Sequence, residues 1–224
     1  MLEILEAAND YNKGLRKSNN RFMFTERDFE EYSQQLNIND RGMMGILRID
    51  AIGVNLPIFH GTGEDVLALG VGHLEGSSLP VGGLGTHTVI TGHNGLPSSI
   101  LLTNLDRMTI GDVFAINVLG ELLFYQVDQT TVIEPYDYSY MQLYHDKDYV
   151  TLMTCTPYGI NSHRLLVRGE RIENEEIAET HAAAPEEKAG DDYWTVIAIA
   201  AIGLLFVIVA FAAKRSQKKR SRQR

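Results

Sequence analysis

One cysteine is the strongest candidate for chemistry in this sequence. Cys155 is the only cysteine among 224 residues, so it has no partner for an intramolecular disulfide. It ends a run in which Val150 and Leu152 alternate with other residues, the pattern of a half-buried strand, and Pro157 and Gly159 then break that strand. A thiol at a strand end can act as a nucleophile, whereas most lone cysteines are small buried apolar residues. The local pattern leaves both interpretations open.

A nucleophilic thiol needs a base or cation nearby and a group that holds the developing oxyanion. Of seven histidines, His93 is best placed, because it ends an apolar strand and has a glycine on each side. Arg164 begins the strand expected after the Cys155 turn, so it can lie beside the thiol across an antiparallel pair and donate two hydrogen bonds. A structural histidine and a surface arginine are the alternatives. Metal-ligand spacings such as His-Glu-x-x-His or paired cysteines do not occur, and we expect no metal and no other cofactor.

Short strands must position these residues. Runs rich in β-forming residues are separated by Gly, Pro, Asn and Asp, and Leu119–Leu122 has the composition of a hairpin turn. Helices are expected over 2–16, after a capping box at Thr25–Asp28, and over 64–70 and 97–105. The fold class is therefore mainly β, and the many short strands favour a closed barrel over a sandwich, which periodicity does not separate. The expected strands are 44–50, 54–59, 86–92, 112–119, 122–129, 149–154 and 165–172.

Charge and hydropathy divide the rest of the chain. Seven of its 20 basic residues lie in 214–224, and the remainder carries 13 basic against 29 acidic residues, which argues against nucleic-acid binding. Residues 194–213 are uncharged and long enough, at about 30 Å as a helix, to cross a bilayer. The basic tail predicts a cytoplasmic C-terminus and an acidic domain outside the cell, in contact with the lipid bilayer through this one span. The alternative interpretation of residues 194–213 is a buried core helix.

We therefore expect five segments: an N-terminal helical extension (1–42), a β-barrel (43–173), an acidic linker (174–193), a transmembrane helix (194–213) and a basic tail (214–224). Export of the barrel needs a signal, but residues 1–20 contain no apolar signal region. We expect the export signal to be missing from this chain; an unusual export route is the alternative.

Three separated motifs resemble those of sortases, the membrane-bound cysteine transpeptidases of Gram-positive bacteria. Thr151-Leu-Met-Thr-Cys155 resembles the TLxTC signature, and the resemblance extends to Thr91-Gly-His93 and to Asn161-Ser-His-Arg164, within residues 43–173. It implies an eight-stranded barrel with Cys155 as the nucleophile, His93 as the proton donor and acceptor, and Arg164 as the substrate and oxyanion stabiliser. The N-terminal extension and the C-terminal span resemble class C, the pilin polymerases.

Class C membership implies cleavage of an LPxTG-like sorting signal and joining of pilin subunits through a lysine. Thr154, Thr156 and Asn94 flank the nucleophile and the histidine, and we expect them to bind substrate. A sortase that attaches proteins to peptidoglycan, a cysteine protease with water as acceptor and a non-catalytic surface adhesin are the alternatives.

The sequence departs from class C at the lid. These enzymes usually carry an Asp-Pro-aromatic motif in an N-terminal segment that plugs the active site, and here Phe22, Met23 and Phe24 occupy that place. Without the Asp and Pro, apolar contacts of about 1.5–3 kcal/mol per buried side chain must offset the entropy of ordering the loop. We therefore expect the segment to be mobile or open, with Phe24 as the stopper if it closes.

Overall fold

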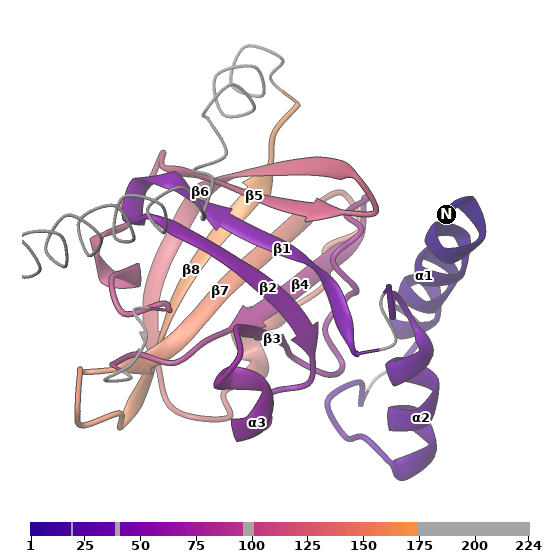
Figure 1. Ribbon diagram of the computed structural model, residues 1–224, viewed down its shortest axis with the longest axis horizontal. Helices are drawn as coiled ribbons and strands as arrows, with labels where there is room; N and C mark the ends of the chain where they lie inside the picture. The colour runs from indigo at the N-terminus through magenta and orange to yellow at the C-terminus, as the bar shows by residue number, and fades with distance from the viewer. Residues whose placement is uncertain (19, 39–40, 96–100, 174–224) are drawn as a thin grey trace, which may run out of the picture. The chain divides into compact units, whose positions relative to one another are not determined.

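The computed structural model describes residues 1–18, 20–38, 41–95 and 101–173 (Figure 1). As expected, eight strands close into a barrel. Their order around it is β1-β2-β3-β4-β7-β8-β6-β5. The neighbours β2–β3 and β4–β7 are parallel and the other pairs are antiparallel. The strands are β1 (Met43–Ile49), β2 (Val54–His60), β3 (Val71–His73), β4 (Thr86–Thr91), β5 (Val113–Val118), β6 (Glu121–Ile133), β7 (Asp148–Thr156) and β8 (His163–Arg171).

The predicted strands are confirmed, with two differences. The three-residue β3 was not predicted, because so short a run of Val-Gly-His carries no readable alternation. β6 extends four residues beyond the predicted 122–129, to Ile133, since its second half pairs with β8. The predicted hairpin turn joins β5 to β6: Leu119 and Gly120 both have positive φ, and Val118 pairs with Glu121.

Side-chain alternation gives the barrel an inner and an outer face. Val150 and Leu152 of β7 belong to the main core, which fills the barrel. Met153 instead packs on a second cluster outside the barrel, made of Val89, Ile133, Met141 and Leu166. Because residues two apart share a face, Thr151, Met153 and Cys155 lie together on this outer side.

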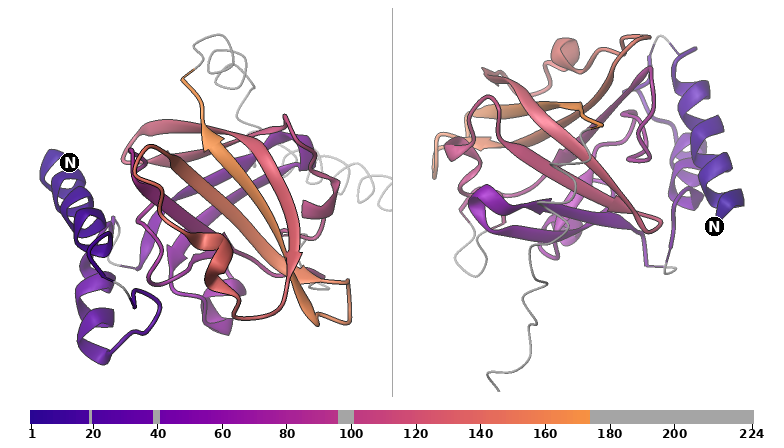
Figure 2. Two further views of the ribbon diagram at one scale, coloured as in Figure 1. Left: turned by 180° about the vertical axis from the view of Figure 1, so that it is seen from behind. Right: turned by 90° about the horizontal axis from the view of Figure 1, so that it is seen from above.

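The helices are few. α1 (Leu2–Leu15) and α2 (Glu26–Gln34) lie at one side of the barrel in every view (Figures 1 and 2). The predicted capping box is present, with Thr25 and Asp28 bonded reciprocally at the start of α2. α3 (Glu64–Leu67) covers part of the predicted 64–70, and three 3₁₀ turns complete the described elements: η1 (Asp50–Ile52), η2 (Leu105–Arg107) and η3 (Tyr138–Met141).

The helix predicted over 97–105 is wrong in its described part. Residues 101–104 form turns and lead into η2, and 97–100 lie outside the described residues. Leu101 has a positive φ of 37°, which a residue in a right-handed α-helix does not adopt.

Two buried polar contacts attach the helices to the barrel. The Asn12 side chain of α1 bonds both main-chain groups of Leu79, donating at 3.2 Å and accepting at 2.7 Å. The Tyr32 hydroxyl of α2 lies 2.9 Å from Nδ1 of His73 and accepts a hydrogen bond from the Gly61 N–H at 3.0 Å. Met1–Asn174 accordingly forms one compact unit.

The hydrogen bonds around His73 identify the ring nitrogen that carries a proton. Nε2 lies 2.8 Å from the Ser78 carbonyl, which can only accept, so Nε2 is protonated, and the Tyr32 hydroxyl lies 2.9 Å from Nδ1 and 3.1 Å from the His73 carbonyl. Burial lowers the pKa of His73 to about 4. An unfolded histidine titrates near pH ~6.5, so the unfolded chain binds more protons between these values and stability falls as the pH is lowered through them.

Replacing His73 with glutamine is expected to remove part of this pH dependence. For a shift of this size, one histidine costs about 2 kcal/mol of unfolding free energy between pH ~8 and pH ~5. Urea unfolding of the whole chain at the two pH values, followed by circular dichroism, measures the difference. His145→Gln is the matched control, since that side chain is 97% exposed. An equal pH dependence in His73→Gln and the unmodified chain would contradict the assignment.

The linker, span and tail predicted over 174–224 lie outside the described residues. Among the residues that are described, no helix is long and apolar enough to cross a membrane.

Candidate active site

Three adjacent strands bring the predicted residues to one end of the barrel. In the parallel pair β4–β7, Thr91 is opposite Met153, and the Gly92 N–H donates to the Met153 carbonyl at 3.1 Å. Two residues further along both chains, His93 and Cys155 reach the same level. In the antiparallel pair β7–β8, Cys155 is directly opposite Arg164. His93 is 62 residues before the cysteine in sequence, and Arg164 is nine residues after it. The register thus places His93 just past the end of β4, and Arg164 on β8, on the two sides of Cys155.

Cys155 and Arg164 share the outer face because they are directly paired. Cys155 is a free, half-buried thiol. The Arg164 guanidinium donates through Nη1 to the carbonyls of Asn161 and His163, at 3.2 and 3.0 Å. These bonds hold Nη1 of the guanidinium over the loop between β7 and β8. Its other nitrogens, Nε and Nη2, are further N–H donors at the strand end.

His93 is half-buried, with 22% of its side chain exposed, and its Nε2 lies 3.3 Å from a carboxylate oxygen of Glu64. Glu64 begins α3 and is 92% exposed. Sequence reasoning missed this contact, because nothing in the local pattern of 64–70 points toward the histidine. A contact with so exposed a carboxylate contributes little to stability.

Two side-chain hydrogen bonds cross between the histidine and cysteine segments. The Thr154 hydroxyl donates to the Gly92 carbonyl at 2.7 Å, and the Asn94 side-chain amide donates to the Cys155 carbonyl at 2.8 Å. A substrate-contacting Thr154 was expected; instead its side chain is 1% exposed and faces the barrel interior, as alternation with Cys155 requires. Thr156 is half-buried opposite His163, and its substrate contact stays a prediction.

Comparison with known families matches a sortase domain to residues 47–172, more than half of the chain. This chain belongs to the sortase family. The match contains all three strands of the site and the residues His93, Cys155 and Arg164.

Named sortases resemble this one over different lengths. Sortase D of Bacillus subtilis (strain 168) is 29% identical over 131 residues, which are 57% of this chain and 63% of that protein. The structure of sortase C1 from Streptococcus agalactiae superposes with a TM-score of 0.74 at 46% identity, covering 77% of this chain and 89% of that one. Streptococcus pneumoniae sortase C gives a TM-score of 0.69 at 46% identity, over 77% and 87%.

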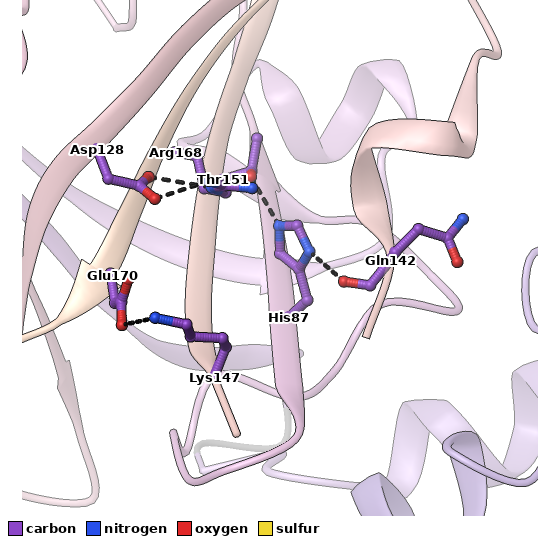
Figure 3. A network of polar contacts seen from close by, with 7 residues as sticks. All are labelled: His87, Asp128, Gln142, Lys147, Thr151, Arg168 and Glu170. Carbon is purple, nitrogen blue, oxygen red and sulfur yellow. Dashed lines mark hydrogen bonds and ion pairs between the residues drawn. The ribbon is translucent and has the colours of Figure 1, made fainter. Parts of the chain in front are cut away.

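A polar network lies on the outer face of this sortase around Thr151, four residues before the cysteine on β7 (Figure 3). His87 of β4 bridges Thr151 of β7, at 2.8 Å, and the Gln142 carbonyl that follows η3, at 2.9 Å. Because that carbonyl must accept, Nδ1 of His87 donates and Nε2 accepts from the Thr151 hydroxyl. Burial lowers the pKa of His87 to about 4, so the bridge is neutral at neutral pH. Arg168 and Asp128 pair on β8 and β6 beside it, at 2.7 Å.

The predicted lid segment lies along the η3 side of this outer face. The Phe22 ring stacks on Tyr138 of η3, with centroids 4.4 Å apart, and packs, like Met153, against the second cluster. Met23 is 76% exposed. Phe24 packs edge-on against Tyr32 of α2, 6.0 Å between centroids. Phe24 thus packs against α2 and the main core, and its role as a stopper of the active site stays a prediction.

Arg21 anchors this segment, which sequence reasoning did not foresee. Its guanidinium donates to the Gly76 carbonyl at 3.0 Å and to the Met141 carbonyl. Burial lowers the pKa of Arg21 to about 10, so the group remains charged at neutral pH. The lid therefore makes polar as well as apolar contacts. A cavity of about 520 Å³ separates it from the loop before β7 and is lined by Arg16, Arg21, Phe22, Tyr138, Gln142 and Leu143.

Within the described ranges, the acidic, histidine and cysteine side chains form no group of three that could hold a metal ion. The chemistry available at the site is that of a thiol, an imidazole and a guanidinium at one barrel end.

Proposed function

We propose that this chain is a class C sortase: a membrane-anchored cysteine transpeptidase that joins pilin subunits. The observation that carries the proposal is the strand register that sets Cys155 opposite Arg164, with His93 at the end of the neighbouring strand. The solved sortase C of Streptococcus pneumoniae, 46% identical to this chain, is described in connection with pilin substrate specificity, which supports pilins as substrates.

The reaction follows from the three groups. The Cys155 thiolate attacks the Thr carbonyl of an LPxTG-like sorting signal, and Arg164 donates hydrogen bonds to the oxygen that becomes negative. The Thr–Gly bond breaks as His93 gives a proton to the departing glycine amine, which leaves a thioacyl-enzyme. A pilin lysine amine then attacks the thioester, loses a proton to His93 and forms an isopeptide bond, while the thiolate leaves. One amide replaces another, so no nucleotide is consumed.

The proposed setting is the outer surface of a Gram-positive cell. The uncharged residues 194–213 would span the lipid bilayer once, and the basic residues 214–224 would remain in the cytoplasm.

Product analysis tests this function. The purified chain is incubated with a sorting-signal substrate in the presence of pilin, of a peptidoglycan-derived amine, or of neither. Pilin-to-pilin isopeptide bonds in the first mixture are expected. Transfer to the peptidoglycan amine alone would identify a wall-anchoring sortase, and hydrolysis in all three mixtures would identify a protease.

The lid contacts predict a gain in substrate affinity when they are removed. Arg21→Ala combined with Phe22→Ala removes two hydrogen bonds and one aromatic pair, and a peptide must displace this segment to lie along the outer face. These contacts together exceed about 1.4 kcal/mol, so their loss lowers the KM for a sorting-signal peptide by at least about tenfold. Alkylation of the half-buried Cys155 by a small reagent changes by less than about threefold, because access for such a reagent does not require lid opening.

Met23→Ala is the matched control, since Met23 belongs to the same segment but is 76% exposed. An unchanged KM in the double variant would show that the segment does not compete with substrate. A tenfold rise in alkylation would instead show that it plugs the thiol itself.

A further inference from the structure

We propose that Asn94 is a positioning residue that fixes the main chain of Cys155 relative to His93. This inference rests on the proposed function for its kinetic consequence and on the structure alone for the contact. Asn94 follows the histidine directly in sequence, and its side-chain Nδ2 donates to the Cys155 carbonyl at 2.8 Å. One residue therefore touches the nucleophile and is bonded covalently to the base.

The orientation of the Asn94 amide is determined by chemistry. The Cys155 carbonyl can only accept a hydrogen bond, so the amide nitrogen must face it; a flipped amide would place two oxygens 2.8 Å apart. The other end of the amide, Oδ1, is buried and has no hydrogen-bond partner among the described residues. Its one hydrogen bond within the described part of the chain is thus the bond to the nucleophile, which indicates that this bond determines the side-chain conformation.

The contact is needed because the backbone ladder stops short of the reacting groups. β4 ends at Thr91, and the last main-chain bond toward β7 is donated by Gly92 to Met153, two residues before the cysteine. The Thr154 hydroxyl adds a bond back to Gly92. Beyond this point, the hydrogen bond from the Asn94 side chain links the two segments at the level of Cys155.

The loop that bears Asn94 is itself held on both sides. The Gly95 N–H donates to the Thr103 hydroxyl at 3.1 Å. Gly95 has φ of +88°, and a Cβ there would lie 2.5 Å from the ring of Tyr158, three residues after the cysteine. The Tyr158 ring therefore rests on the glycine, and the histidine loop and the cysteine loop approach closely at a second point. Asn94 lies on a supported backbone, as a residue that positions another must.

Two substitutions test the role of the donated hydrogen bond. Asn94→Leu and Asn94→Asp both keep the side-chain size and remove the N–H donor, and only the second adds a charge. Misplacement of a reacting group by a fraction of an ångström to 1 Å costs up to about 10²-fold, so we expect kcat for a sorting-signal peptide to fall by about 10–100-fold in both variants. KM is expected to change by less than about threefold, because a positioning residue acts on the chemical step. Asn104→Asp, in the same connection between β4 and β5, is the matched control for charge.

A second arm requires no substrate. The rate of Cys155 alkylation by iodoacetamide is measured in the unmodified chain, in Asn94→Leu, in His93→Ala and in the double variant. If Asn94 acts by holding the thiol beside the imidazole, Asn94→Leu slows alkylation about threefold or more when His93 is present and by less than about 1.5-fold when it is absent. Equal effects in both backgrounds would overturn the proposal, as would unchanged kcat or a loss confined to Asn94→Asp. Because this arm is independent of any peptide, it distinguishes failure of the Asn94 role from failure of the proposed function.

Discussion

Cys155→Ala is expected to abolish transfer completely and to leave the fold unchanged. The sulfur is the only atom at the site that can form the thioester, and Cys155 is the only cysteine in the chain. The side chain is half-buried, so removal of one sulfur atom costs no more than about 1 kcal/mol of stability. Transfer of a sorting-signal peptide to an amine acceptor measures the activity, and thermal unfolding measures the fold.

Cys155→Ser provides the control for shape, because it keeps the size and polarity of the side chain and replaces the thiolate with a poorly ionised hydroxyl. Both variants should be inactive. If purified Cys155→Ala still joined pilin to pilin, a thioacyl mechanism would be excluded for this chain.

Arg164→Lys is expected to slow the reaction on the order of 10²-fold, by comparison with the loss of one oxyanion donor in other enzymes. Lysine keeps the charge but loses the planar group, which makes two hydrogen bonds to the loop between β7 and β8. His93→Ala is expected to be at least as damaging, since general acid–base groups contribute about 10²–10⁴-fold. Steady-state kinetics with a sorting-signal peptide measure both losses.

Arg48→Lys is the matched control, because Arg48 lies on β1 and pairs with Asp50 at 2.7 Å. Near-normal turnover in Arg164→Lys would show that only the positive charge of this residue contributes to the reaction. Near-normal turnover in His93→Ala would place the acid and base elsewhere.

The strands that carry the site could be predicted because their signals are local. Alternation located β4, β7 and β8, and the turn residues Pro157 and Gly159 located the strand end that carries Cys155. The direct opposition of Cys155 and Arg164 also follows from a tight connection between antiparallel strands. The spacing of Cys155 and Arg164 in the sequence therefore predicts this part of the site.

The remaining parts depend on contacts between distant segments. Nothing in the residues around Arg21 predicts that its guanidinium reaches the carbonyls of Gly76 and Met141, which lie 55 and 120 residues away. The inward direction of Thr154 could have been read from its alternation with Cys155, but proximity in sequence was taken as proximity to substrate. The contacts of Phe22 with Tyr138 and of Phe24 with Tyr32 likewise depend on where α2 packs.

The most direct test is the mass of the enzyme after brief exposure to a sorting-signal peptide. The chain is mixed with an LPxTG-containing peptide without any amine acceptor, quenched in acid and digested, and the peptide that contains Cys155 is analysed by mass spectrometry. We expect this peptide to carry the mass of the sorting signal up to and including its threonine, and to lose that mass when hydroxylamine is added. An acyl group on any other residue, or cleavage of the signal without an adduct on Cys155 under single-turnover conditions, would contradict a thioacyl-enzyme formed by this thiol.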